Sequence, residues 1–170
     1  MNVAGQFAGT SDTPLTPMGK EQASAAGKQA RDAGLVFDVI LASPLDRTHE
    51  TARLVATEVG YPHEEIQLVD GLIERHFGAL EGVYHGDFHV TREEYIADPF
   101  AVDHVEGIEK ITDLQYRANQ MHEYLLSLPH ETILVVSHGA FGRALERAVK
   151  NMPITEFGTP LENAQLIQLI

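Results

Sequence analysis

The chain contains no cysteine, and this absence excludes disulfide bonds, zinc–thiolate sites and thiol nucleophiles. Because a protein without disulfides suits a reducing compartment, we expect a cytoplasmic location. The first residues, MNVAGQFAGT, carry neither the basic nor the apolar region of a signal peptide. No apolar run reaches the roughly 18 residues that a membrane helix needs, so we expect no membrane partner.

Basic residues are scarce. The sequence has 12 Lys and Arg against 25 Asp and Glu, which gives a formal net charge of −13. A nucleic-acid surface needs clustered Lys and Arg to neutralise phosphates, so we exclude nucleic acid as a partner. If the protein binds an anion, it must do so in a local pocket, and each arginine near such a pocket becomes informative.

The remaining composition is typical of a soluble globular protein, with 44% hydrophobic and 22% charged residues. A chain of 170 residues is long enough for one domain with a substantial core. No internal repeat or low-complexity run divides it. We therefore expect residues 1–170 to form a single domain.

Apolar periodicity and helix-capping signals predict an alternation of strands and helices. Helices are predicted at 16–33, 43–59, 92–97, 108–128 and 140–150, and strands at 37–42, 66–69, 132–136 and 164–170. Such alternation indicates βαβ units, and nearly continuous apolar strands indicate a sheet buried on both faces. The predicted fold class is therefore a three-layer α/β/α sandwich with a mostly parallel central sheet.

Two of the predicted strands end in serine and lead directly into a helix, in the stretches ILAS-PLDR and LVVS-HGAF. Ligands bind just beyond the carboxyl ends of the strands in such sheets, so residues 43–47 and 137–139 should lie side by side at one rim. His138 would then lie at the binding edge, where Gly139 lets a ligand approach a helix N-terminus. A capping or buried histidine is the alternative that the local sequence leaves open.

Arg47 falls in the first turn of its predicted helix, where the helix dipole favours anions over cations. This placement suggests that the side chain binds something negative. A guanidinium suits a phosphoryl group because its forked donors match two oxygens at once. The alternative is a surface ion pair with Asp46 or Glu50.

Glu74 lies in LIERHFGALEG, an irregular segment bounded by glycines and rich in hydrophobic side chains. Such surroundings desolvate a carboxyl group and favour its protonated form, which can serve as a general acid. The alternative is an ion pair with the neighbouring Arg75.

Together these segments resemble the histidine phosphatase superfamily, the phosphoglycerate-mutase-like enzymes. The resemblance spans nearly the whole chain and rests on five stretches in the family's order. They are GQFAGTSDTPLTPMGKEQA (5–23), ILASPLDRTHETA (40–52), LIERHFGALEG (72–82), VVSHG (135–139) and ENAQL (162–166). The resemblance implies a phosphoglycerate-mutase-like fold and phosphoryl transfer through a phosphohistidine, without a metal or organic cofactor.

The resemblance also assigns catalytic roles to three residues. Arg47 matches a phosphate-clamping arginine, Glu74 the proton donor to the leaving group, and His138 the second histidine, which hydrogen-bonds the phosphoryl oxygens. These roles fit phosphoryl transfer, which depends on positioned donors and on protonation of the leaving oxygen.

The remaining assignments concern substrate binding. Asn2 and Gly9 match the substrate-side asparagine and glycine, Gly139 lies beside the second histidine, and Asn163 matches a late asparagine at the pocket edge. The expected ligand is a small phosphorylated metabolite or inorganic phosphate.

One family motif is missing from the 170 residues. The family begins with a strand that ends in Arg-His-Gly, whose histidine is the nucleophile, whereas the one Arg-His pair here is Arg75-His76. Asn2 aligns a few residues past that motif, and the chain ends at Ile170 within an apolar run, so we expect truncation at the N-terminus and a shortened C-terminus. Without the nucleophile and its strand, we expect a chain that is inactive in phosphotransfer and is marginally stable or forms a homo-oligomer.

Three functions remain as alternatives. We favour a phosphatase of a small metabolite over a sugar-phosphate mutase, because the segment 82–90 lacks the long insertion of larger mutases. The second is a catalytically dead module that binds phosphate or a phospho-ligand. The third is a metal-dependent hydrolase built on His85 and His89, although the glycine in HGDFH makes that segment a poor helix.

Overall fold

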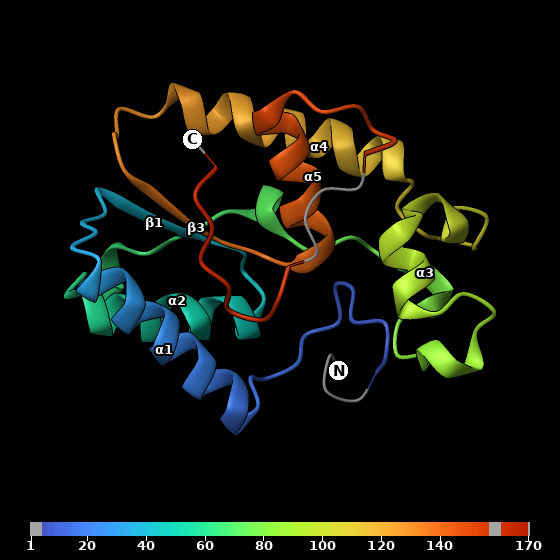
Figure 1. The fold of residues 1–170 in the computed structure, drawn as a ribbon, viewed down its shortest axis with the longest axis horizontal. Coiled ribbons are helices and arrows are strands. Elements are labelled where there is room, and N and C mark those ends of the chain that lie inside the picture. Colours follow the sequence, from blue (N-terminus) through green and yellow to red (C-terminus); the bar gives the residue numbers. More distant parts are fainter. Residues whose placement is uncertain (1–4, 157–160, 170) are drawn as a thin grey trace.

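A parallel three-stranded sheet in the order β2-β1-β3 forms the centre of the fold (Figure 1). The computed structural model describes residues 5–156 and 161–169. The strands are β1 (Val39–Ala42), β2 (Gln67–Leu68) and β3 (Ile133–Val136). All four residues of β1 pair with β3, from Val39 opposite Ile133 to Ala42 opposite Val136. The parallel sheet with helices on both faces confirms the predicted α/β class.

Two helices, α1 and α2, lie side by side beneath the sheet in the view of Figure 1. Helix α1 (Pro17–Asp32) begins after Thr16, whose side chain accepts a hydrogen bond from the Gly19 amide at 3.0 Å. Helix α2 (Asp46–Val59) ends at Gly60, which adopts the left-handed φ of 73°. Both boundaries carry the local signals from which they were predicted, an N-capping threonine before proline and a C-terminal glycine.

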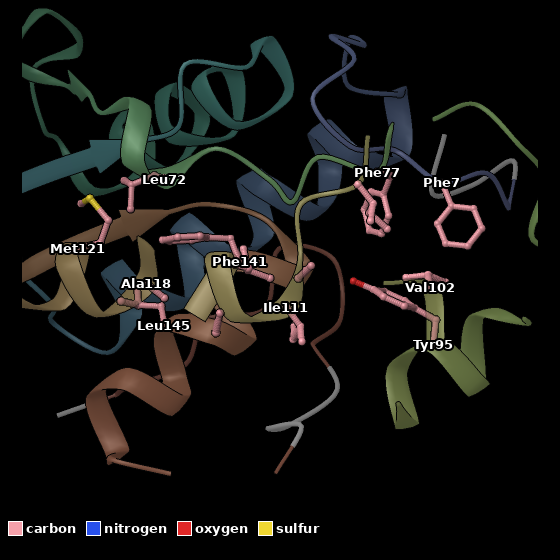
Figure 2. Packing of buried hydrophobic residues seen from close by; sticks show 14 of the residues in the cluster. Phe7, Leu72, Phe77, Tyr95, Val102, Ile111, Ala118, Met121, Phe141 and Leu145 are labelled. Atoms are coloured by element: carbon pink, nitrogen blue, oxygen red, sulfur yellow. The ribbon is translucent and has the colours of Figure 1, made fainter. Parts of the chain in front are cut away.

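The opposite face of the sheet is covered by α4 (Ile111–Ser127) and α5 (Gly139–Lys150). Their apolar side chains pack together with β1 in the larger core cluster, part of which Figure 2 shows. Ile40 and Ala42, which alternate with the residues of that cluster along β1, pack instead against α2. This alternation gives the sheet its two covered faces.

Helix α3 (Arg92–Ala97) begins with a capping box between Thr91 and Glu94 and carries Tyr95, whose ring packs near Phe77. Short 3₁₀ helices recur between the longer elements, and three of them lie within residues 70–90, which were predicted to be irregular. They span His63–Glu65, Asp70–Leu72, Gly78–Leu80, His85–Asp87 and Pro99–Val102. None of the helices that the structure describes combines the length and the apolar composition needed to cross a bilayer.

Two helices begin three residues later than predicted. Helix α2 begins at Asp46 and not at Ser43, because Leu45 keeps an extended backbone and Ser43 still donates to Val136 of β3. Helix α4 begins at Ile111 and not at residue 108, since Lys110 has the extended backbone of an N-cap. Both displacements shorten the helices by only a few residues.

The predicted strand at 164–170 was wrong over its described part, because residues 161–169 belong to no strand. Leu166 and Leu169 pack against the two core clusters without joining the sheet. The expectation of burial on both faces holds for β1, all of which is buried, but in β3 only Leu134 is buried. Within the described residues, β3 pairs with β1 alone.

Candidate functional site

The carboxyl ends of β1 and β3 bring together the two segments that were predicted to meet. Ser43, just after β1, donates from its backbone N–H to the Val136 carbonyl at 3.0 Å. Beyond the strands, Nε of Arg47 donates to Nδ1 of His138 at 3.3 Å. The predicted proximity of residues 43–47 and 137–139 is therefore confirmed.

The guanidinium of Arg47 is held by three acceptors. Besides His138, Nη1 donates to the Ser11 carbonyl at 2.9 Å and Nη2 to the Gly9 carbonyl at 2.7 Å. A guanidinium has five N–H groups, so three are used here and the other two have no partner among the described residues. Arg47 therefore does not form the surface ion pair with Asp46 or Glu50 that the sequence left open.

His138 is partly buried, and both of its ring nitrogens have partners. Nε2 lies 2.8 Å from the hydroxyl of Ser43, while Nδ1 faces Arg47. Burial, together with the positive charges of Arg47 and Arg117, lowers the pKa of His138 from 6.5 to about 3. The ring is therefore neutral near pH 7, with Nδ1 as acceptor and Nε2–H as donor. The His138 side chain makes no helix-capping hydrogen bond and is not fully buried, so neither alternative reading of this residue holds.

Glu74 lies buried against the N-terminus of α5. Oε1 accepts from the backbone N–H groups of Arg75 at 2.8 Å and Phe141 at 3.0 Å, and Oε2 accepts from Ala140 at 3.1 Å. Three backbone N–H groups, two of them in the first turn of α5, therefore hold both carboxyl oxygens of Glu74 in place. The side chain of Arg75 instead pairs with Asp103, so the alternative of a Glu74–Arg75 side-chain pair is not what forms.

The substrate-side residues are distributed unevenly. Gly9 is buried and contributes its carbonyl to Arg47, and Gly139 is the first residue of α5. Asn163 is exposed, and Asn2 lies outside the described residues. A cavity of about 1170 Å³ is lined by Arg47, Glu74, His138, Gly139 and Asn163. The structure thus gathers the predicted catalytic side chains around one cavity.

Arg117 and Ser43 were not recognised from the sequence as contributors to the site. Arg117 on α4 donates to the carbonyls of Ile73 at 2.7 Å and Gly71 at 3.0 Å, and thereby holds the chain that leads into Glu74. Its guanidinium lies 4.7 Å from the centre of the Phe141 ring. Arg117 also pairs with Glu109, where Nε donates at 3.0 Å and Nη2 at 2.9 Å. No local pattern marks its part in the site, because the carbonyls of Gly71 and Ile73 lie more than forty positions away. Ser43 could have been found, since the rim prediction already placed it at a strand end.

The segment that suggested a metal site has the wrong geometry for one. His85–Asp87 forms a short 3₁₀ turn, so His85 and His89 do not share one face of an α-helix. The His85 ring packs against Phe7 at a tilt of 52°, with ring centres 4.1 Å apart. Among the described residues, no group of three or more His, Asp or Glu side chains is placed to hold a metal ion.

The chain is similar to known proteins in both sequence and fold. The family model described as "Histidine phosphatase superfamily (branch 1)" matches residues 1–170. A 2,3-bisphosphoglycerate-dependent phosphoglycerate mutase of Brucella melitensis is 31% identical over 164 residues, which cover 89% of this chain and 76% of that protein.

Two solved structures show the same fold. A mycobacterial glucosyl-3-phosphoglycerate phosphatase in complex with VO3 matches with a TM-score of 0.76 and 25% identity, covering 92% of this chain and 79% of that one. A phosphoserine phosphatase mutant from Entamoeba histolytica in complex with phosphoserine matches with a TM-score of 0.71 and 26% identity, covering 92% and 77%.

Proposed function

The chain belongs to the histidine phosphatase superfamily, and on that basis we propose that its rim pocket binds the phosphoryl group of a small phosphorylated metabolite. Proteins similar to it are named as mutases and phosphatases. We place this chain in the phosphatase branch, whose reaction would pass through a phosphohistidine. The short connection between Gly82 and Val90 supports that branch over a sugar-phosphate mutase.

The contact between Arg47 and His138 is the observation that carries this proposal. It places a cation with two remaining N–H groups beside a titratable ring at the carboxyl edge of a parallel sheet. A phosphoryl oxygen is a stronger acceptor than a carbonyl, and the guanidinium fork matches two such oxygens.

Glu74 is proposed as the proton donor to the leaving oxygen. Oε2 has a single hydrogen-bond partner among the described residues, so this oxygen retains room for a proton. Donation from Oε2 would leave the negative charge on a carboxylate that three backbone N–H groups already stabilise.

Turnover also requires a nucleophile, and the 170 residues contain no Arg-His-Gly. We therefore propose that the chain by itself binds phosphoryl groups without hydrolysing them. This makes a catalytically inactive phospho-ligand module the second candidate function. The neutral His138, with both nitrogens engaged by protein groups, supports this candidate because such a ring is poorly placed to attack phosphorus.

Two measurements test the proposal. Hydrolysis of p-nitrophenyl phosphate, measured with a chelator present, should be absent from both the wild-type chain and the His138→Ala variant. Turnover that disappears in His138→Ala would overturn the proposed inactivity.

Binding of inorganic phosphate, measured by isothermal titration calorimetry, tests the pocket. Arg47→Ala should weaken it at least about tenfold, because one charge-assisted contact contributes about 1.5–3 kcal/mol. Arg53→Ala, on the exposed side of α2, is the matched control and should leave the affinity unchanged. Equal affinities in the two variants would contradict the assignment of the pocket.

A further inference from the structure

The carboxylate of Glu81 gathers an unusual number of donors for a side chain outside the site. It lies in the same stretch as Glu74, and its side chain is only 15% exposed. Oε1 accepts from the Thr10 amide and hydroxyl, both at 3.0 Å, and from the Phe77 amide at 3.3 Å. Oε2 accepts from the amide of Ser11 at 3.0 Å and from its hydroxyl.

These donors keep Glu81 ionised. Burial by itself raises the pKa of the carboxyl, but the hydrogen bonds from Ser11, Thr10 and Phe77 outweigh burial and lower the pKa to about 2. The nearest cationic candidate, Nε2 of His76, is 3.9 Å away on a half-exposed side chain. The ionised carboxylate of Glu81 therefore acts mainly as a hydrogen-bond acceptor for Thr10 and Ser11.

The same loop holds Arg47 from its other side. The carbonyls of Gly9 and Ser11 accept from Nη2 and Nη1 of Arg47, and Nε of Arg47 donates to His138. Two side-chain hydrogen bonds and two backbone ones thus fix the loop to Glu81, while its carbonyls face the guanidinium. A continuous set of contacts runs from Glu81 through residues 9–11 to the phosphate-binding arginine.

Gly9 shows how closely Glu81 approaches this loop. A Cβ atom at position 9 would lie 2.3 Å from Oε1 of Glu81 and 3.0 Å from the Arg75 carbonyl. Any side chain at position 9 would push the carboxylate of Glu81 away from the loop, so the observed close approach requires glycine there. The resemblance assigned Gly9 to the substrate side, whereas the structure also gives it this packing role.

We propose that Glu81 is a positioning residue, which fixes the loop of residues 9–11 so that its carbonyls orient the guanidinium of Arg47 for phosphoryl binding. The inference rests on the proposed function of the pocket. Glu81 touches no reacting atom in this arrangement and acts only through Arg47. Small displacements of such a positioned group reduce binding and rate strongly.

The first test compares Glu81→Gln with a matched control, Glu58→Gln. Glu58 is 18% exposed and accepts from Ser24 at 2.6 Å and Arg31 at 3.0 Å, so it joins α1 to α2 away from the pocket. Both variants should lower the thermal midpoint, because each loses a charged acceptor. Only Glu81→Gln should weaken the binding of inorganic phosphate in calorimetry, by about ten- to a hundredfold.

A double-mutant cycle separates positioning from a general loss of stability. In an Arg47→Lys background, Glu81→Gln should cause little further loss of phosphate affinity, because the group that it orients has been removed. If the double variant loses as much binding free energy as the two single variants together, the inference is overturned, since Glu81 would then act independently of Arg47.

A third readout needs no ligand. The Nε–H resonance of Arg47 should move in Glu81→Gln toward that of the exposed Arg53, because the bond to His138 is released. If wild-type protein binds no phosphate, the proposed function fails, yet this resonance still tests the inference. An Arg47 resonance that is unchanged in Glu81→Gln would overturn the positioning role.

Discussion

Nε of Arg47 donates a hydrogen bond to Nδ1 of His138 at 3.3 Å, which joins two residues 91 positions apart. The contact connects the first turn of α2 with the N-cap residue of α5, and each helix follows a strand of the parallel sheet. Because Nδ1 acts as the acceptor, the ring must be neutral for this contact to persist. Protonation of His138 and the orientation of Arg47 are therefore linked.

The free energy of unfolding should fall as the pH drops below 6.5, because His138 then takes up a proton in the unfolded chain but not in the folded one. Burial and the charges of Arg47 and Arg117 lower its pKa from 6.5 to about 3 in the folded state, so the unfolded chain binds this proton more tightly. The stabilising contribution is complete above pH 6.5 and is lost as the pH falls toward 3, on the order of several kcal/mol in total. Urea unfolding between pH 6.5 and 4.5, above the range in which Glu81 titrates, measures this slope.

Two variants test this dependence of unfolding free energy on pH: His138→Gln is the test, and His63→Gln, at an exposed position, is the control. His138→Gln should flatten the dependence of unfolding free energy on pH in this window, and His63→Gln should leave it in place. An unchanged slope in His138→Gln would show that other groups produce the dependence.

Arg75 should be essential for stability and not only for local structure. Its fully buried guanidinium pairs with Asp103 and donates to the carbonyls of Glu109 at 2.8 Å and Pro99 at 3.0 Å. Arg75→Met would leave these acceptors unpaired and should lower the free energy of unfolding by about 3–5 kcal/mol. Urea denaturation checks this, with Arg53→Met on the surface of α2 expected to change stability by less than about 0.5 kcal/mol.

Gly78 and Gly82 offer a test of close backbone approach. Both have positive φ, 55° and 81°, so alanine should cost about 1–2 kcal/mol at either position through backbone strain. A Cβ at Gly78 would also lie 2.3 Å from the Glu106 carbonyl, whereas a Cβ at Gly82 meets nothing within 4 Å. Gly78→Ala should therefore be clearly the more destabilising in chemical denaturation; equal losses would mean that the 106–108 segment moves aside freely.

The free edge of β3 should promote self-association. Within the described residues β3 pairs only with β1, which leaves one row of its backbone groups available to another strand. Sedimentation velocity should show a weight-average mass that rises with protein concentration. Thr132→Lys, at the exposed residue immediately before β3, should reduce this rise, and Thr57→Lys on α2 should not. A monomer at all concentrations would contradict the expectation.

Local signals predicted most of the helices and strands because the physical causes of those elements are themselves local. Thr16 before Pro17 determines where α1 begins, and Gly60 determines where α2 ends. The segment 164–170 shows the limit of such signals. Its apolar pattern suits a strand, but a strand exists only when a neighbour supplies hydrogen bonds, and residues 161–169 have none in the sheet.

The resemblance to a family, and not strand topology, assigned Glu74 to the site. The sequence alone determined the α/β class and the meeting of residues 43–47 and 137–139, which brings Arg47 beside His138. It could do so because parallel strand ends must share an edge. Only the tertiary structure decided which partner each polar group receives: the carbonyl of Gly9 for Arg47, the amides of α5 for Glu74, and the loop of residues 9–11 for Glu81. Hydrogen bonds require placement within a few tenths of an ångström between segments far apart in the chain, and no local pattern encodes that placement.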